Sequence, residues 1–103
     1  MKNKSYVQFL TGEDKLQIQF IENHGEILKF AVQYCGLVCG RWRTILRIDN
    51  FHHNGKPHKH IYYLKKKKMV VYLGIDVALA FTEAKKHIVG NYNKIKENYL
   101  LTD

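Results

Sequence analysis

The sequence predicts an α+β domain in which an antiparallel sheet of about five strands packs against one C-terminal helix. Two patterns carry this prediction. Apolar and polar residues alternate with a period of two through most of residues 6–73, which is typical of strands with one buried face. After Asp76, apolar residues recur at helical spacing. A chain of 103 residues fits a single domain, residues 1–103.

The first expected element is a β-hairpin. Residues 6–10 and 16–20 have strand character, and residues 12–14 between them have turn-forming side chains. A second turn is expected at residues 23–25. A third strand follows over residues 28–34, with a helix as the alternative for this segment.

The fourth strand follows a tight connection at residues 36–40. In it, Trp42, Thr44, Leu46 and Ile48 alternate with Arg43, Ile45, Arg47 and Asp49, and the second set is expected to face away from the core. A polar loop over residues 50–57 leads to a fifth strand over residues 58–64. Four lysines interrupt this strand before its character resumes over residues 69–73.

A helix is expected after Asp76, which is a candidate N-cap because its carboxylate can accept a hydrogen bond from a free backbone N–H of the first turn. The apolar positions at helical spacing are Val77, Phe81, Ala84, Ile88, Ile95 and Tyr99. This stripe should cover one face of the sheet.

The chain is basic, with 17 Lys and Arg against nine Asp and Glu and a formal net charge of +8. Such a charge favours nucleic acid, anionic lipid or an acidic protein as a partner, although a coding bias towards lysine would produce the same excess. The candidate residues for binding RNA or DNA are Arg43, Lys65, Lys66, Lys67 and Lys68. Tyr62, Tyr63 and Tyr72 could stack on bases, or they could belong to the sheet core beside a solvated lysine loop.

No run of residues approaches the ~20 apolar positions of a membrane span, and the N-terminal residues lack the apolar segment of a secretion signal. The only cysteines, Cys35 and Cys39, are too few for a disulfide framework and are separated by three residues rather than two. We therefore expect a cytoplasmic protein without membrane contact, whose thiols are buried or line a loop.

Arg47, Asp49, His58 and His60 form the candidate catalytic set. If the fourth and fifth strands pair, these side chains can converge near the loop that joins them, with both histidines on an exposed strand face. An arginine for phosphate, a carboxylate that orients an imidazole and two proton-transferring histidines suit metal-independent RNA cleavage. The alternative is structural, with the aspartate capping a turn and the histidines merely solvated.

Histidines also raise the question of a metal site. His52, His53, His58 and His60 could gather around zinc, nickel or copper. Their spacing matches no standard closed site, so we expect adventitious binding at most, with no functional metal and no cofactor.

One motif resembles a known family. Residues 47–50, Arg-Ile-Asp-Asn, a glycine-containing loop and residues 57–61, Pro-His-Lys-His-Ile, resemble the central signature of the TumE-type toxins of prokaryotic toxin–antitoxin pairs. The resemblance implies a toxin that pairs with an antitoxin protein, with Asp49, Asn50, His58 and His60 at the positions of the family's polar core. The four lysines and the two cysteines fall outside this pattern.

Two hypotheses about function follow. The first is a toxin that acts on nucleic acid as a metal-independent ribonuclease, and the second is a non-catalytic module that binds nucleic acid or protein. Convergence of the four catalytic candidates around a cleft would favour the first, and a flat basic surface would favour the second. In either case we expect a homodimer, because an open sheet leaves edges that need cover.

Overall fold

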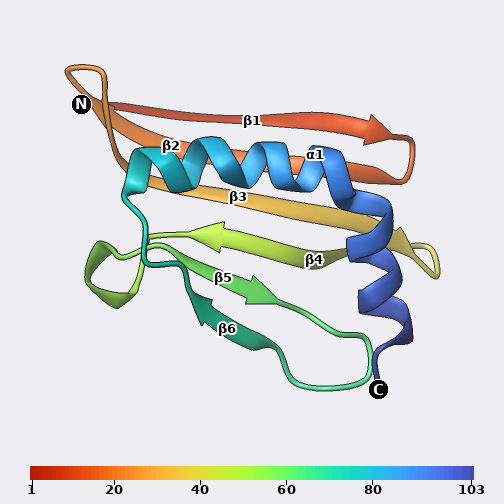
Figure 1. The fold of residues 1–103 in the computed structure, drawn as a ribbon. Helices are drawn as coiled ribbons and strands as arrows, with labels where there is room; N and C mark the ends of the chain where they lie inside the picture. The colour runs from red at the N-terminus through yellow and green to blue at the C-terminus, as the bar shows by residue number, and fades with distance from the viewer.

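The computed structural model describes the backbone of residues 1–103 and every side chain except that of His53. Its six strands form one antiparallel sheet in which each strand lies beside the next one in the sequence (Figure 1). The strands are β1 (Lys2–Thr11), β2 (Asp14–Asn23), β3 (Glu26–Val38), β4 (Arg41–Asp49), β5 (His58–Ile61) and β6 (Met69–Tyr72). A 3₁₀ turn, η1 (His53–Gly55), precedes β5, and the helix α1 (Val77–Leu101) follows β6.

The predicted α+β fold is confirmed, with six strands rather than about five. The additional strand arises because the chain turns back between Ile61 and Met69. The four lysines lie in this connection, where their charges stay in solvent. The segment expected to resume one strand therefore forms a separate strand, β6, which pairs antiparallel with β5.

Three hairpins close with two-residue turns, and in two of these turns both central residues have positive φ. His24 and Gly25 have φ values of 52° and 80°, and Cys39 and Gly40 have values of 52° and 77°. Positive φ at both central residues is the signature of a type I′ turn, whose twist matches that of the flanking strands. The turn at Cys39 and Gly40 is shorter than the connection predicted at residues 36–40. Both thiols are free, with Cys35 buried and Cys39 exposed.

A β-bulge in β4 overturns part of the predicted strand pattern. The register with β3 shifts by one residue between Tyr34, which pairs with Leu46, and Cys35, which pairs with Thr44. Ile45 is the additional residue, and it is buried in the core. Residues 42 and 44 therefore lie on the face away from the helix, and Arg43 lies on the helix side, the reverse of the prediction.

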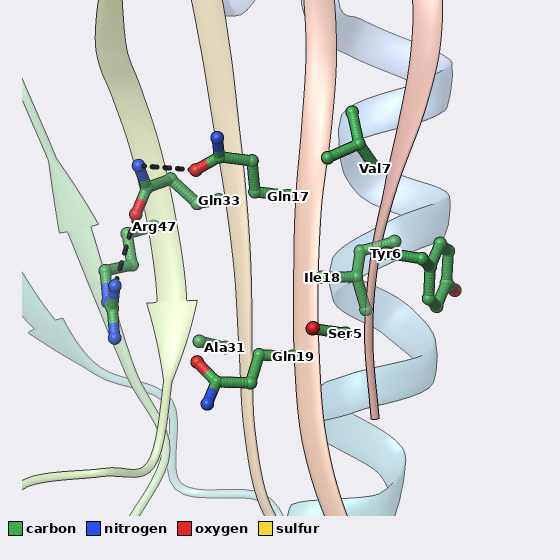
Figure 2. Close-up of a pocket in the computed structure, with 9 residues that line it drawn as sticks. All are labelled: Ser5, Tyr6, Val7, Gln17, Ile18, Gln19, Ala31, Gln33 and Arg47. Carbon is green, nitrogen blue, oxygen red and sulfur yellow. Dashed lines mark hydrogen bonds between the residues drawn. The ribbon is translucent and has the colours of Figure 1, made fainter. Parts of the chain in front are cut away.

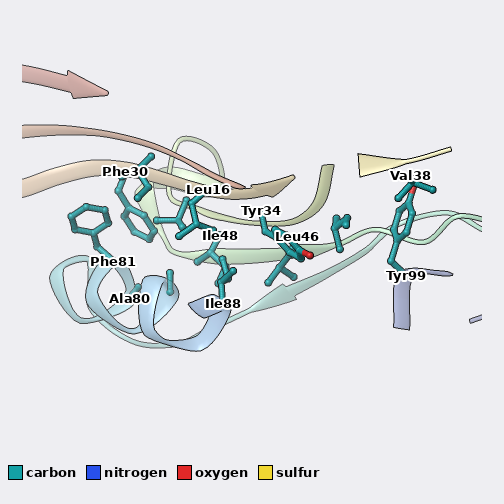
Figure 3. Packing of buried hydrophobic residues seen from close by; sticks show 14 residues of the cluster. Leu16, Phe30, Tyr34, Val38, Leu46, Ile48, Ala80, Phe81, Ile88 and Tyr99 are labelled. Atoms are coloured by element: carbon teal, nitrogen blue, oxygen red, sulfur yellow. The ribbon is translucent and has the colours of Figure 1, made fainter. Parts of the chain in front are cut away.

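The core lies between α1 and one face of the sheet (Figure 3). Alternate residues of β2, β3 and β4 supply the sheet side, and Ala80, Phe81, Ala84, Ile88 and Tyr99 supply the helix side. The ring of Phe81 packs 5.4 Å from that of Phe30. The predicted N-cap is confirmed, because Asp76 accepts a hydrogen bond of 2.9 Å from the backbone N–H of Leu79.

The helix covers only part of the sheet. Its N-terminal turns run along β2 and β3, and its last turns run towards the β5–β6 connection (Figure 1). There the backbone N–H of Leu64 donates to the carbonyl of Tyr99 at 3.0 Å. In the described part of the chain, no α-helix lies on the opposite face of the sheet. Among the described side chains, no helix combines the length and apolar composition needed to cross a bilayer.

The edges of the sheet are β1 and β6. Of the ten residues in β1, nine are exposed, and its outer backbone groups have no neighbouring strand in this chain. That a second copy covers such an edge stays a prediction.

Candidate functional site

The face of the sheet opposite α1, called the open face below, carries most of the polar candidates. Residues paired across an antiparallel ladder share a face, so the register assigns its members. They include Val7, Phe9, Lys15, Gln17, Gln33, Trp42, Thr44, Arg47, Asp49, His58, His60 and Tyr72.

Three of the four predicted catalytic residues meet on this face. Arg47 lies opposite His60 in the β4–β5 ladder, and its Nε donates a hydrogen bond to Oδ2 of Asp49. The same carboxylate oxygen lies 3.6 Å from Nε2 of His60, within ion-pair distance when the imidazole is protonated. On the other side of the ring, Nδ1 of His60 lies 3.4 Å from Nζ of Lys68.

The expectation that both histidines project from an exposed strand face is wrong for His60, which is only 6% exposed, and Asp49 is only 1% exposed. Burial of this kind requires partners, and Arg47 supplies the compensating charge. His58 is more accessible. Its ring packs 5.4 Å from that of Tyr72, and its Nδ1 lies 2.8 Å from the carbonyl oxygen of Lys56.

The two accessible members of the set, Arg47 and His58, line different hollows. His58 lines an open hollow with Asn54, Lys56 and Tyr72. Arg47 instead lines a separate depression of about 390 Å³ over β1, β2 and β3 (Figure 2). Asp49 and His60 are therefore buried between two surface hollows, and their partner Arg47 reaches the larger one.

Amide side chains form the floor of the larger depression. Nη1 of Arg47 donates to Oε1 of Gln33 at 3.1 Å, and Nε2 of Gln33 donates to Oγ1 of Thr44 at 2.9 Å. Gln17 and Gln19 lie beside them on β2 (Figure 2). This row presents hydrogen-bond donors and acceptors without a net negative charge.

An aromatic pair that the sequence reasoning missed lies at one end of the open face. The rings of Phe9 and Trp42 meet edge to face, with centroids 6.2 Å apart. Nζ of Lys15 lies 4.2 Å from the centre of the Trp42 ring. Phe9 is 61% exposed and Trp42 is 40% exposed, so their surfaces are available to a ligand. The bulge at Ile45 explains the omission, because unbroken alternation would bury residue 42.

The predicted basic residues do not form one patch. Arg43 lies on the helix side of the sheet, away from Arg47. The lysines occupy the β5–β6 connection, where Lys65 pairs with Asp103 at 3.3 Å and Nζ of Lys66 lies 4.6 Å from the Tyr63 ring. Only Lys68 approaches the candidate catalytic cluster.

Tyr62, Tyr63 and Tyr72 were predicted either to stack on bases or to belong to the sheet core, and the structure shows a different environment for each. Tyr62 packs against the core, whereas Tyr72 is 58% exposed on the open face. Tyr63 is partly buried beneath Lys66. Tyr72 alone has both the exposure and the position for stacking on a ligand of the open face.

The helix side holds a second buried carboxylate, also missed in the sequence. Asp14 accepts hydrogen bonds from the Tyr34 hydroxyl at 2.5 Å, from Lys96 Nζ at 3.2 Å and from the Thr11 hydroxyl at 2.7 Å. Burial alone would raise the pKa of Asp14, but these donors outweigh it and lower the pKa. Burial and the adjacent carboxylate raise the pKa of Tyr34 above its ordinary range. This cluster joins the helix to the sheet.

The proposed metal ligands include His53, whose side chain lies outside the described residues. Among the side chains that are described, no three His, Cys, Asp or Glu residues are grouped so as to hold a metal ion.

The motif that resembled a toxin signature has a structural explanation at Asn50. Its Oδ1 accepts from the backbone N–H of Phe30 at 2.8 Å, and its Nδ2 donates to the carbonyls of Leu28 and Gly55 at 3.0 Å and 3.2 Å. These bonds hold the loop after β4 against β3. A short Asp-Asn motif can therefore arise from this local requirement.

Comparison with known proteins corrects the resemblance. No curated protein and no solved structure matches the chain. Residues 1–102 match the family described as "Domain of unknown function (DUF7718)". The assignment to the TumE-type toxins is therefore wrong, and with it the basis for an antitoxin partner is lost. Because the match extends over nearly the whole sequence, the chain belongs to the DUF7718 family.

Proposed function

We propose that the chain binds single-stranded nucleic acid across the open face of its sheet. The observation that carries the proposal is the exposed pair Phe9 and Trp42, with Lys15 over the Trp42 ring. Proteins that bind single strands combine aromatic side chains, on which bases stack, with cations that contact the phosphates. Both groups occur together at this end of the sheet.

The rest of the open face supports the same ligand. The depression lined by Gln17, Gln19 and Gln33 offers donors and acceptors to base edges, and Arg47 lies at its border. At the far edge, the exposed ring of Tyr72 beside His58 provides a second aromatic position. The carboxylate of Asp49 is buried and paired with Arg47, so it presents little negative charge to a phosphate.

The overall charge of +8 supplies the long-range attraction that such binding requires. A cytoplasmic location, where RNA is abundant, belongs to the same proposal.

Trp42 allows a direct test, because it is the only tryptophan in the chain. Titration with a single-stranded oligonucleotide at about 50 mM salt should quench its fluorescence, and the affinity should fall as salt rises. Phe9→Ser should weaken binding by about tenfold, the loss expected for one stacked base. The matched control is Leu101→Ser, which removes an exposed apolar side chain at the end of α1, away from the open face.

A second pair of variants separates local contact from net charge. Lys15→Gln and Lys86→Gln remove the same charge, but Lys86 lies exposed on α1, on the opposite side of the sheet. The proposal expects a clear loss of affinity only for Lys15→Gln. Equal losses in both variants, or no quenching at low salt, would contradict it.

Metal-independent RNA cleavage is the second candidate, favoured by the cluster of Arg47, Asp49 and His60. Asp49 and His60 are buried, which argues against their direct contact with a substrate, so His58 is the residue best placed to exchange protons with RNA. Incubation with labelled RNA and a chelator tests this. Cleavage that disappears in His58→Ala, with binding and thermal stability retained, would establish it, and intact RNA throughout would exclude it.

A further inference from the structure

A groove on the helix side has no role in the proposed nucleic-acid interface. It lies between the C-terminal half of α1 and strands β4 and β5 and has a volume of about 250 Å³. Sites for drug-sized ligands usually measure ~300–1,000 Å³, so this groove suits a smaller molecule. Figure 1 shows the last turns of α1 running beside this part of the sheet.

The floor of the groove is apolar. Ile45, Leu46 and Tyr99 form its buried part, and Ile61 and Ile95 are only partly covered. The partly covered side chains leave apolar surface in contact with water. A ligand with an apolar chain or ring would remove that surface from water, at about 25 cal/mol per Å².

The rim is polar and positively charged. His87, Asn91, Lys94 and Asn98 recur at spacings of three and four residues, which places them on one side of α1. Lys59 of β5 lies on the opposite rim. None of the residues lining the groove is an aspartate or a glutamate.

The electrostatics of His87 reflect this arrangement. Partial burial and, to a smaller extent, the charge of Lys59 lower its pKa. The charged groups around the imidazole are Lys59 on β5, Lys94 further along α1, and Glu83, which shares a neighbouring hollow with His87 and Lys59. An anion placed between the two rims would favour protonation of His87.

We propose that this groove binds a small amphipathic anion, a carboxylate or phosphate attached to a short apolar chain or ring. The anionic group lies between Lys59 on one rim and His87 and Lys94 on the other, with Asn91 and Asn98 as neutral hydrogen-bond donors. The apolar part lies on Ile61 and Ile95. This site is separate from the open face, so it stands whether or not the chain binds nucleic acid.

Octanoate is a suitable probe, with octanol and octyl phosphate as comparisons. Amide chemical-shift mapping of the whole protein should show octanoate and octyl phosphate perturbing the residues of the groove. Octanol, which has the same chain without the charge, should bind at least about tenfold more weakly, the difference expected from losing a charge-assisted hydrogen bond. Inorganic phosphate should bind weakly because it lacks the apolar part.

Substitutions test the two rims. Lys59→Gln and Lys94→Gln should each weaken octanoate binding by about tenfold, whereas Lys86→Gln, which removes the same charge outside the groove, should leave it unchanged. Lowering the pH from about 7.5 to about 5.5 should tighten binding as His87 becomes protonated, and His87→Gln should abolish that dependence.

Several results would overturn the proposal: no shifts with octanoate at about 10 mM, where even weak sites are occupied; equal affinity for octanol; or equal losses in Lys59→Gln and Lys86→Gln. Perturbation of the groove by an oligonucleotide but not by octanoate would assign it to nucleic acid instead. Failure of the nucleic-acid proposal shows separately, as an absence of Trp42 quenching.

Discussion

Asp14 and Asp49 are both buried carboxylates of the same sheet, but they lie on opposite faces and are bonded differently. Both oxygens of Asp14 accept hydrogen bonds, and its partners come from β1, β3 and α1. Oδ1 of Asp49 has no hydrogen-bond partner among the described residues. The first cluster is complete and connects the two layers of the fold, whereas the second retains an unused acceptor. Stability should therefore depend more on Asp14 than on Asp49.

The largest expected effect comes from Asp14→Ala. It leaves the hydroxyl of fully buried Tyr34 without its acceptor and Lys96 without its counter-ion. We expect the free energy of unfolding to fall by about 3 kcal/mol, as measured by urea denaturation. Asp103→Ala, which removes an exposed partner of Lys65, is the control and should have little effect. A loss below about 1 kcal/mol for Asp14→Ala would mean that this cluster does not anchor the helix.

A second prediction concerns acid. The pKa of Asp14 is lowered by folding from the ordinary value of 3.8, so the unfolded chain binds more protons between the two pKa values. Stability from this group is therefore complete above the unfolded pKa and is lost as the pH falls through the folded one. Asp14→Asn lacks this contribution at every pH. The stability difference from the unsubstituted protein should be constant near neutral pH and shrink below about pH 4. A difference independent of pH would show that the charge of Asp14 is not involved.

The smallest effect is expected from Asp49→Asn. An amide oxygen can still accept from Arg47, so we expect a loss of only about 1 kcal/mol, less than for Asp14→Asn in the same urea series. The substitution also removes the one carboxylate of the β4–β5 cluster, so oligonucleotide affinity should rise slightly. If Asp49→Asn lost more stability than Asp14→Asn, the cluster on the open face would contribute more to stability than the one on the helix side.

Local patterns predicted the strands, the N-cap at Asp76 and the helix because each depends on neighbouring residues. Asp14 was interpreted as part of a turn, since nothing near it in the sequence reveals a partner 82 positions away. The apolar–polar pattern of a sequence shows which face of a strand or helix a residue occupies, but it does not show which distant residue that side chain contacts.

The candidate site was predictable in part. Pairing of β4 with β5 brings Arg47, Asp49 and His60 together, as strand alternation indicates. Their burial was not predictable, because it depends on how the surrounding side chains and connections pack. The bulge at Ile45 left a trace in the sequence that the prediction of one regular strand overlooked: two polar residues, Arg43 and Thr44, are followed by two apolar residues, Ile45 and Leu46. The pairing with β3 shows that Ile45 is the additional residue.

The order of the strands also has a consequence for synthesis of the protein. Every strand pairs with its sequence neighbour, so the sheet can assemble hairpin by hairpin as the chain leaves the ribosome. The helix that covers the apolar residues of β2, β3 and β4 comes last. Until α1 emerges, side chains such as Leu16, Phe30 and Ile48 remain open to solvent and to other chains. The nascent sheet is therefore the species most exposed to aggregation, and ribosomal stalling before residue 77 would prolong its lifetime.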